Sequence, residues 1–152
     1  RLSVVGEGSS VVGPFNSELD LPGPIEITTN LTAGTIIDSR QPFRLSWING
    51  RPGDLVNVRL LSGIPLGQSD TVYSGLEYYA PAEEGSVTLD PIELLSGRSA
   101  LPLTPSDSFT VIVRYFPSTP VKFAAAGLTL GGEHRWVYEF RFLGLRLRST
   151  ND

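Results

Sequence analysis

The sequence predicts an all-β fold, an antiparallel β-sandwich, and three observations lead to this class. Apolar residues recur with a period of two in several short segments, which is typical of half-buried strands. Turn-forming residues separate these segments, since the 152 residues include 16 Gly and 12 Pro. No segment has the apolar spacing of an amphipathic helix of three turns. Regularly spaced short strands without helices are typical of sandwiches and barrels.

The clearest strand is predicted over Arg135–Phe142, where aromatic residues alternate with Val137, Glu139 and Arg141. Trp136, Tyr138, Phe140 and Phe142 share one face of this strand, which we expect to be the core face. After Gly144 the alternation changes phase, because leucines now alternate with arginines. A β-bulge near Gly144 would keep the apolar side chains pointing inward.

Seven further segments have the composition of strands, being short, rich in β-branched or aromatic residues and bounded by turn residues. They are Ile25–Thr29, Phe43–Ile48, Leu55–Leu61, Thr71–Tyr79, Ser86–Leu89, Phe109–Phe116 and Val121–Ala125. Within them, Trp47 is expected to fill the space between two sheets. Asp54 follows Gly53 and is expected in a turn. Pro91–Ser96 is the one predicted helical turn, with Gly97 just after its end.

Residues 1–24 are predicted to form an N-terminal arm or an extra edge strand, and residues 25–152 the sandwich. The stiff break Pro22-Gly23-Pro24 separates the two. The arm could be an added edge strand, a linker, or a strand lent to a neighbouring subunit. In the last case Leu2, Val4 and Val11 would add to an open sheet edge of the next copy. Such head-to-tail contacts would build a homopolymeric fibre.

Composition argues against several partners. The net charge of −4 is mild and no basic run is present, so we expect no nucleic-acid partner. No apolar stretch approaches the roughly 18 residues of a membrane-spanning helix. The chain has no Cys, which removes disulfides and thiolate sites, and it has no Met. Because residue 1 is Arg1, the chain is expected to be a processed or excised piece, as removal of a signal peptide would produce.

Residues that could perform chemistry are isolated, so we expect neither an enzyme nor a cofactor or metal site. His134 is the one histidine, and its Gly-rich surroundings predict a solvated turn residue. Glu83 and Glu84 are adjacent on an expected turn, where they would not converge on one substrate. Four loop acids could bind Ca²⁺ if they met at one end of the sandwich, although their spacing is not that of an EF-hand; they are Asp54, Asp70, Asp90 and Asp107.

Two patterns suggest a ligand or a modification. Asn30-Leu31-Thr32 fits the acceptor pattern for N-glycosylation, so Asn30 is a candidate site. Tyr73, Tyr78, Tyr79 and the aromatic stripe from Trp136 to Phe142 could form a flat platform for a sugar. A stripe that alternates with charged residues is more typical of the core face of a strand.

The order of these segments over roughly residues 25–148 resembles the immunoglobulin-like C-terminal domains of large secreted bacterial proteins. The resemblance rests on Phe43–Trp47 with the strand Val56–Leu61, on Tyr78–Ala82, on Gly85–Pro91 and on Phe123–Leu128 with the final strand. Tyr79 stands where members of that family often have a Cys. The resemblance implies an extracellular, structural or adhesive module without catalytic residues; a carbohydrate- or ligand-binding accessory module is the alternative.

Overall fold

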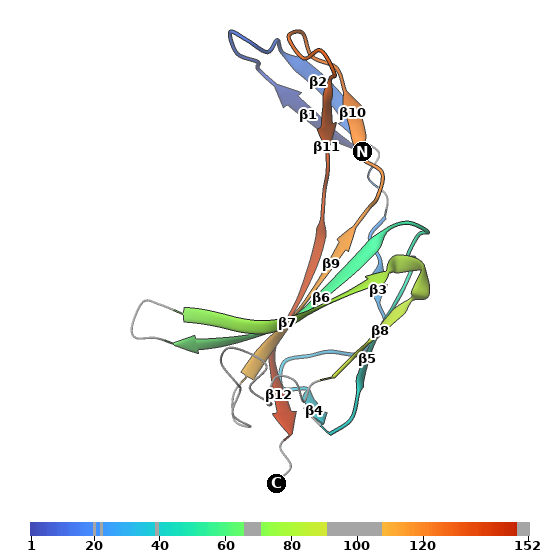
Figure 1. Ribbon diagram of the computed structural model, residues 1–152, viewed down its shortest axis with the longest axis vertical. Coiled ribbons are helices and arrows are strands. Elements are labelled where there is room, and N and C mark those ends of the chain that lie inside the picture. Colours follow the sequence, from blue (N-terminus) through green and yellow to red (C-terminus); the bar gives the residue numbers. More distant parts are fainter. Residues whose placement is uncertain (20, 22, 39, 66–70, 91–107, 149–152) are drawn as a thin grey trace.

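Two β-sheets pack face to face in the computed structural model, which describes residues 1–19, 21, 23–38, 40–65, 71–90 and 108–148 (Figure 1). The larger sheet has the strand order β4–β12–β9–β6–β7 and the smaller one has the order β3–β5–β8. The larger sheet comprises β4 (Ile36–Asp38), β12 (Tyr138–Arg148), β9 (Ser108–Phe116), β6 (Leu55–Pro65) and β7 (Thr71–Pro81). The smaller sheet comprises β3 (Glu26–Ile27), β5 (Phe43–Ile48) and β8 (Ser86–Leu89). The predicted all-β sandwich is thereby confirmed.

The chain passes repeatedly between the two sheets. It runs from β5 in the smaller sheet to the β6–β7 hairpin in the larger one, returns to β8, and crosses again to β9. Strand β9 lies between β6 and β12 and pairs antiparallel with both. One pair departs from the antiparallel expectation, because β4 runs parallel to the end of β12.

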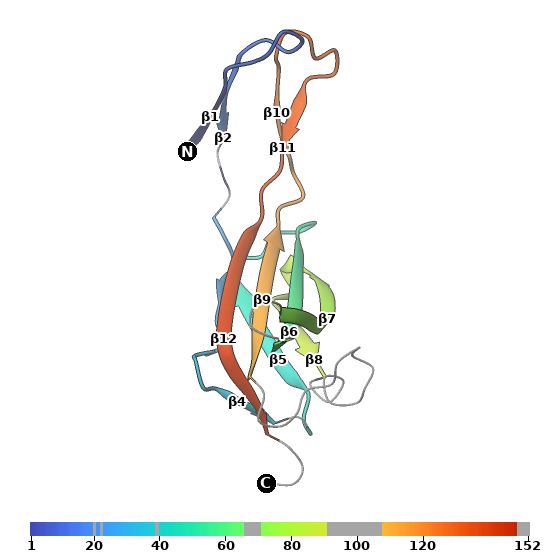
Figure 2. The same cartoon turned by 90° about the vertical axis from the view of Figure 1, so that its left-hand side faces the viewer.

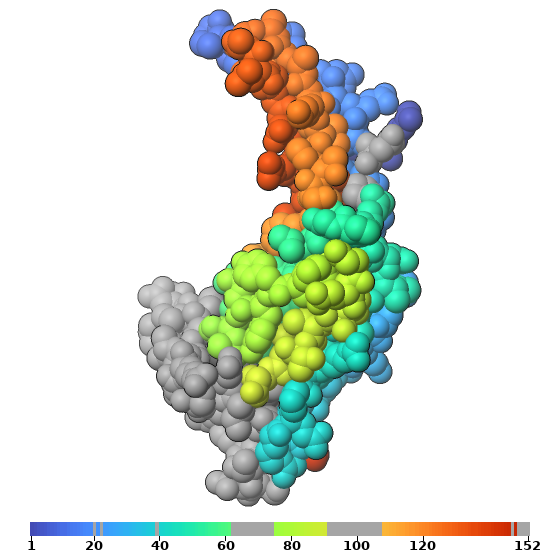
Figure 3. Space-filling model, turned by 45° about the vertical axis from the view of Figure 1, so that its right-hand side comes forward, coloured from blue at the N-terminus to red at the C-terminus, as the bar shows by residue number. Residues whose placement is uncertain are grey.

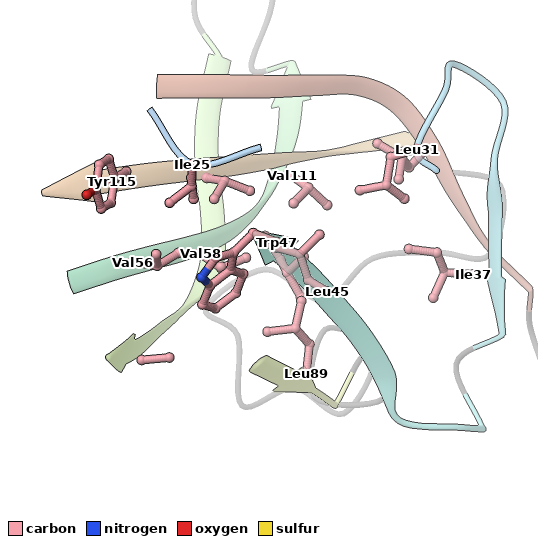
Figure 4. Packing of buried hydrophobic residues seen from close by; sticks show 14 of the residues in the cluster. Ile25, Leu31, Ile37, Leu45, Trp47, Val56, Val58, Leu89, Val111 and Tyr115 are labelled. Atoms are coloured by element: carbon pink, nitrogen blue, oxygen red, sulfur yellow. The ribbon is translucent and has the colours of Figure 1, made fainter. Parts of the chain in front are cut away.

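The core lies between the two sheets and is centred on Trp47 (Figure 4). Leu45 and Trp47 of β5 are buried, whereas Arg44 and Ile48 point outward, as a period of two requires. The indole Nε1 of Trp47 donates a hydrogen bond of 2.7 Å to the carbonyl oxygen of Ala82. This bond satisfies the one polar atom of an otherwise apolar side chain, so the predicted role of Trp47 is confirmed.

The predicted bulge in the last strand is also confirmed. The pairing of β12 with β9 shifts register between Phe142 and Leu145, and Gly144 has a φ of 72°. Glycine adopts this left-handed conformation without the steric penalty of a side chain. The bulge leaves Leu143 exposed and Leu145 fully buried, so the apolar face continues past it.

Several element boundaries differ from those predicted. The last strand begins at Tyr138 rather than at Arg135, because its partner β9 pairs with it only as far as Tyr115. Trp136 therefore lies in a connection and not on the strand. Strand β3 covers two residues, Glu26–Ile27, while β6 and β7 are longer than expected. A single 3₁₀ turn, η1 (Ala82–Glu84), follows Pro81; the predicted helical turn Pro91–Ser96 lies outside the described residues.

A second region extends from one end of the sandwich. It consists of two antiparallel hairpins, β1 (Leu2–Gly6) with β2 (Phe15–Leu19), and β10 (Val121–Phe123) with β11 (Gly132–His134). Figures 1 and 2 show the hairpins as two layers that stand away from the sandwich, and Figure 3 shows that this part is narrower than the body. We call residues 1–19 and 121–134 the projection.

Candidate functional site

The projection joins the N-terminal arm to a segment that the sequence assigned to the sandwich. The predicted strand Val121–Ala125 is present only as β10, Val121–Phe123, and it lies beside β2 instead of within a sandwich sheet. The division at residue 24 thus differs from the spatial arrangement. The arm is a hairpin that packs on its own chain, rather than a single extended strand.

Stacked rings hold the two hairpins together. The ring centroids of Phe15 on β2 and Phe123 on β10 are 4.4 Å apart, and their planes differ by 26°. The imidazole of His134 stacks on the Phe123 ring, with a centroid distance of 4.5 Å. Gly6 and Gly132 lie against the Phe15 and Phe123 rings, where a Cβ atom would collide with them. A side chain at either glycine would therefore have to displace the ring that it meets.

The position of His134 corrects the sequence-based prediction. It was expected to be a solvated turn residue, but it is a half-buried member of β11, and its Nε2 atom is buried without a hydrogen-bond partner among the described residues. The prediction was wrong because the Gly-rich segment before it is the turn of a hairpin, and His134 already lies on the returning strand.

The far ends of the hairpins are also joined. The backbone N–H of Gly13 donates a 2.7 Å hydrogen bond to the carbonyl oxygen of Ala126. Gly127, with a φ of 87°, lies against the backbone of Val11 so closely that a side chain would not fit. The connection between β1 and β2 is thereby fixed to the turn between β10 and β11, and the projection is one unit.

The β1–β2 hairpin has two different faces. The inner face is the one that carries the Phe15 ring, which meets the other hairpin. On this face three residues of β1 lie opposite three of β2, in the pairs Leu2 with Leu19, Val4 with Ser17, and Gly6 with Phe15. The outer face carries Ser3 and Val5 opposite Glu18 and Asn16. All four outer side chains are exposed, and that of Val5 is 70% exposed.

The three predicted arm residues are therefore divided between two places. Leu2 and Val4 share the inner face, as their spacing indicated, whereas Val11 lies in the connecting loop and is 76% exposed. Val5, the most exposed apolar residue of β1, was not among the predicted arm residues. Alternation alone could not identify it, because Val4 and Val5 are identical and only the hairpin register assigns each to a face.

The outer edge of β1 is the feature that suits an interaction. In the part of the chain that the structure describes, β1 pairs with β2 alone, so its other edge presents unpaired backbone groups. No residue of Leu2–Gly6 is charged and none is Pro. Charged residues, prolines and bulges are the usual means by which proteins protect such edges, and β1 has none of these within it.

A buried carboxylate fixes the junction between sandwich and projection. Asp54, just before β6, is only 5% exposed; it accepts hydrogen bonds from the Tyr115 hydroxyl and from the backbone N–H of Ser118, the latter at 2.8 Å. Ser118 lies between β9 and β10, at the entrance to the projection. Burial by itself raises the pKa of Asp54, but these hydrogen bonds outweigh it and hold the pKa below its ordinary value.

The other acidic residues do not converge. Asp70 and Asp107 lie outside the described residues, and no group of three metal-ligating side chains occurs among the residues that are described. Glu83 and Glu84 are exposed on η1, as expected for a turn. Asp54 is engaged by Tyr115 and Ser118, so it is a structural residue rather than a free loop acid.

The aromatic residues do not form one exposed platform within the described chain. Tyr138, Phe140 and Phe142 pack against the core cluster, as does Tyr78, while Tyr79 is 63% exposed. The side chain of Tyr73 lies outside the described part. Trp136 is half-buried and lines a pocket of about 310 Å³ at the junction, together with Arg51, Asp54 and Ser118.

The candidate glycosylation residue Asn30 is exposed in the connection between β3 and β4. The neighbouring Leu31 is buried, and the Thr32 side chain shares a hydrogen bond with that of Thr35. Modification of Asn30 stays a prediction.

Comparison with known proteins gives no relative: no family model, curated protein or solved structure matches this chain. Within the described ranges, no helix is long and apolar enough to cross a membrane.

Proposed function

We propose that this chain is a non-enzymatic structural or adhesive module of an exported protein, which works by contacts with other protein chains. The observation that carries the proposal is the projection: it holds an uncharged, single-partner edge strand away from the body of the sandwich. An edge of this kind accepts a further strand through main-chain hydrogen bonds. The extracellular location rests on the resemblance of residues 25–148 to domains of secreted bacterial proteins.

Strand addition at the edge of β1 fits the structure better than release of the whole arm. Release would separate Phe15 from Phe123 and break the hydrogen bond from Gly13 to Ala126. Addition at the edge leaves both contacts intact, since the outward backbone groups of β1 take part in neither. The fibre expected from the sequence is therefore proposed to grow from folded copies.

The test compares self-association of the chain with that of two matched variants. Val5→Lys places a charge on the exposed side of β1, and Leu143→Lys places the same charge on the sandwich, where Leu143 is 60% exposed. We expect Val5→Lys to weaken association about tenfold and Leu143→Lys to leave it unchanged. Sedimentation equilibrium over a range of concentrations measures this, and negative-stain microscopy shows whether filaments form.

Monomeric behaviour of the unmodified chain at millimolar concentration would remove self-assembly from the proposal. An equal effect of both lysine variants would contradict the assignment of the contact to β1.

A ligand-binding module is the second candidate, and the pocket at the junction is the observation that favours it. This pocket brings the Trp136 ring together with Arg51 and with the hydroxyl-bearing Ser118 and Thr119. An aromatic ring beside polar groups is the usual composition of a small-molecule site, and about 310 Å³ is at the lower end of the range for such sites. A glycan array tests it: binding that is lost in Arg51→Ala would support this function, and an array without hits would remove it.

A further inference from the structure

The two residues that flank β1 carry opposite charges. Arg1 precedes the strand and Glu7 follows it, with the five uncharged residues of β1 between them. Arg1 contacts Glu18 at 3.4 Å, but both side chains are about 70% exposed, so this pair is weak. Glu7 is exposed and makes no ion pair with the residues that the structure describes. The edge of β1 is thus uncharged in the middle, with one cation and one anion at its ends.

We propose that β1 pairs with β1 of a second copy, antiparallel, about a two-fold axis that passes beside Val4. This inference rests on the proposed function and names the contact through which it acts. In an antiparallel pair centred on Val4, a residue that precedes Val4 by a given number of positions in one copy lies opposite the residue that follows Val4 by the same number in the other copy. Arg1 of each copy then lies opposite Glu7 of the other, and two ion pairs close the ends of the contact.

The side chains specify this register. A shift by two residues would place Arg1 opposite Val5 or Ser9 and would remove both ion pairs. A shift by one residue would bring inner-face residues of one copy opposite outer-face residues of the other. In the proposed register Val4 meets Val4 on the inner face, and Ser3 meets Val5 on the outer face. Directly opposite side chains of this kind contribute roughly 0.2–1 kcal/mol each.

The pairing would also remedy a weakness of the projection. A sheet of two strands is marginally stable in water, and three or more strands with an apolar face are needed for independent stability. Joining two β1 strands makes a four-stranded sheet in the order β2–β1–β1–β2. The axis is normal to this sheet, so both inner faces lie on the same side. A two-fold contact closes on itself and gives a dimer; a fibre would need a second contact elsewhere.

The experiment uses the absence of cysteine from the chain, which allows single-cysteine variants to be read without background. Val4→Cys places two thiols directly across the axis, where opposite Cβ atoms are about 4.5–5.5 Å apart. Leu130→Cys is the control, since Leu130 is 99% exposed in the same projection but belongs to the turn between β10 and β11 and not to β1. We expect mild oxidation to cross-link Val4→Cys at least about tenfold faster than Leu130→Cys.

A charge exchange tests the register. Arg1→Glu and Glu7→Arg each place like charges opposite one another and should weaken dimerisation about threefold to tenfold. The double variant restores both ion pairs with exchanged signs and should recover the affinity of the unmodified chain. Recovery would not follow from a merely structural role of Arg1, because the double variant still lacks the Arg1–Glu18 contact.

The outcomes separate this inference from the proposed function. If the unmodified chain associates but Val4→Cys cross-links no faster than Leu130→Cys, the two-fold contact is wrong while self-association stands. Growth of filaments through β1 on the long edge strand β7 would produce that result. If the unmodified chain stays monomeric and Val4→Cys does not cross-link, both the contact and self-assembly are wrong. Preferential cross-linking together with recovery in the double variant supports the contact.

Discussion

The sandwich and the projection use similar strands but are stabilised by different means. In the sandwich, two sheets enclose a continuous core, and every member of the main buried cluster lies there, from Ile25 to Leu145. In the projection, two sheets of two strands each meet through the stacked rings of Phe15, Phe123 and His134. The buried side chains of its first hairpin are Ser17 and Leu19.

This difference indicates how folding and interaction are divided between the two regions. Burial of apolar area is the main stabilising contribution to folding, and the sandwich contains nearly all of it. The position of the projection depends on the sandwich, because its hairpins are continuous with sandwich strands. Strand β2 leads to β3, β10 follows β9, and β11 leads to β12. The projection carries an uncharged, unpaired strand edge with the exposed Val5 beside it, and such an edge can accept a further strand.

The largest effect is expected in the core of the sandwich. Trp47→Ala would leave a cavity between the sheets and would leave the carbonyl oxygen of Ala82 without its indole donor. We expect the free energy of unfolding to fall by about 3–5 kcal/mol. Urea denaturation followed by circular dichroism measures it. Leu143→Ala, at an exposed position, should change stability by no more than about 0.5 kcal/mol; similar losses in both variants would contradict the described core.

The second effect is expected at the junction between the two regions. Asp54→Asn removes a charged acceptor from the Tyr115 hydroxyl and the Ser118 N–H, and we expect a loss of about 1–3 kcal/mol at pH 7. Urea denaturation at several pH values measures the difference between the two proteins.

The pH dependence of that difference has a defined sign. The pKa of Asp54 is lower in the folded protein than in the unfolded chain, so its charge stabilises the fold above the unfolded pKa of about 3.9. The stability advantage of the unmodified protein should therefore be constant near neutral pH and disappear as the pH falls from about 4 through the lowered pKa. A difference that stayed the same at pH 7 and pH 2 would show that the Asp54 charge does not stabilise the junction.

A smaller and local effect is expected within the projection. Phe15→Ala removes the ring that stacks on Phe123, but it touches no member of the sandwich core cluster. Amide hydrogen exchange in β1 and β2 should become about fivefold to tenfold faster, while exchange in β9 is unchanged. Val5→Ala, on the outer face of the same hairpin, serves as the control. Equal acceleration in β9 would mean that the two regions unfold together.

The smallest effect is expected at the surface of the projection. Glu18→Gln removes the ion pair with Arg1, whose side chains are 71% and 69% exposed. Solvent screens such a pair, so we expect a change in stability of about 0.5 kcal/mol or less. Thermal denaturation at low and high salt measures it; a clearly larger loss confined to low salt would show that this exposed ion pair stabilises the projection.

The sequence by itself determined the fold class, the inward-facing Trp47 and the bulge at Gly144. These follow from local patterns, since the period of two and the change of phase after Phe142 are both visible in one strand. It also predicted that the first residues are set apart from the sandwich, and that Leu2 and Val4 share a face.

Only the tertiary structure decided which segments lie together in the projection. Residues 1–19 and 121–134 are far apart along the chain, and no local pattern relates Phe15 to Phe123 or turns His134 toward both. The burial of Asp54 likewise depends on Tyr115 and Ser118, more than sixty residues away. Contacts between distant segments are set by packing, and the same alternation of Val4 and Val5 acquires an inner and an outer face only once β1 is paired with β2.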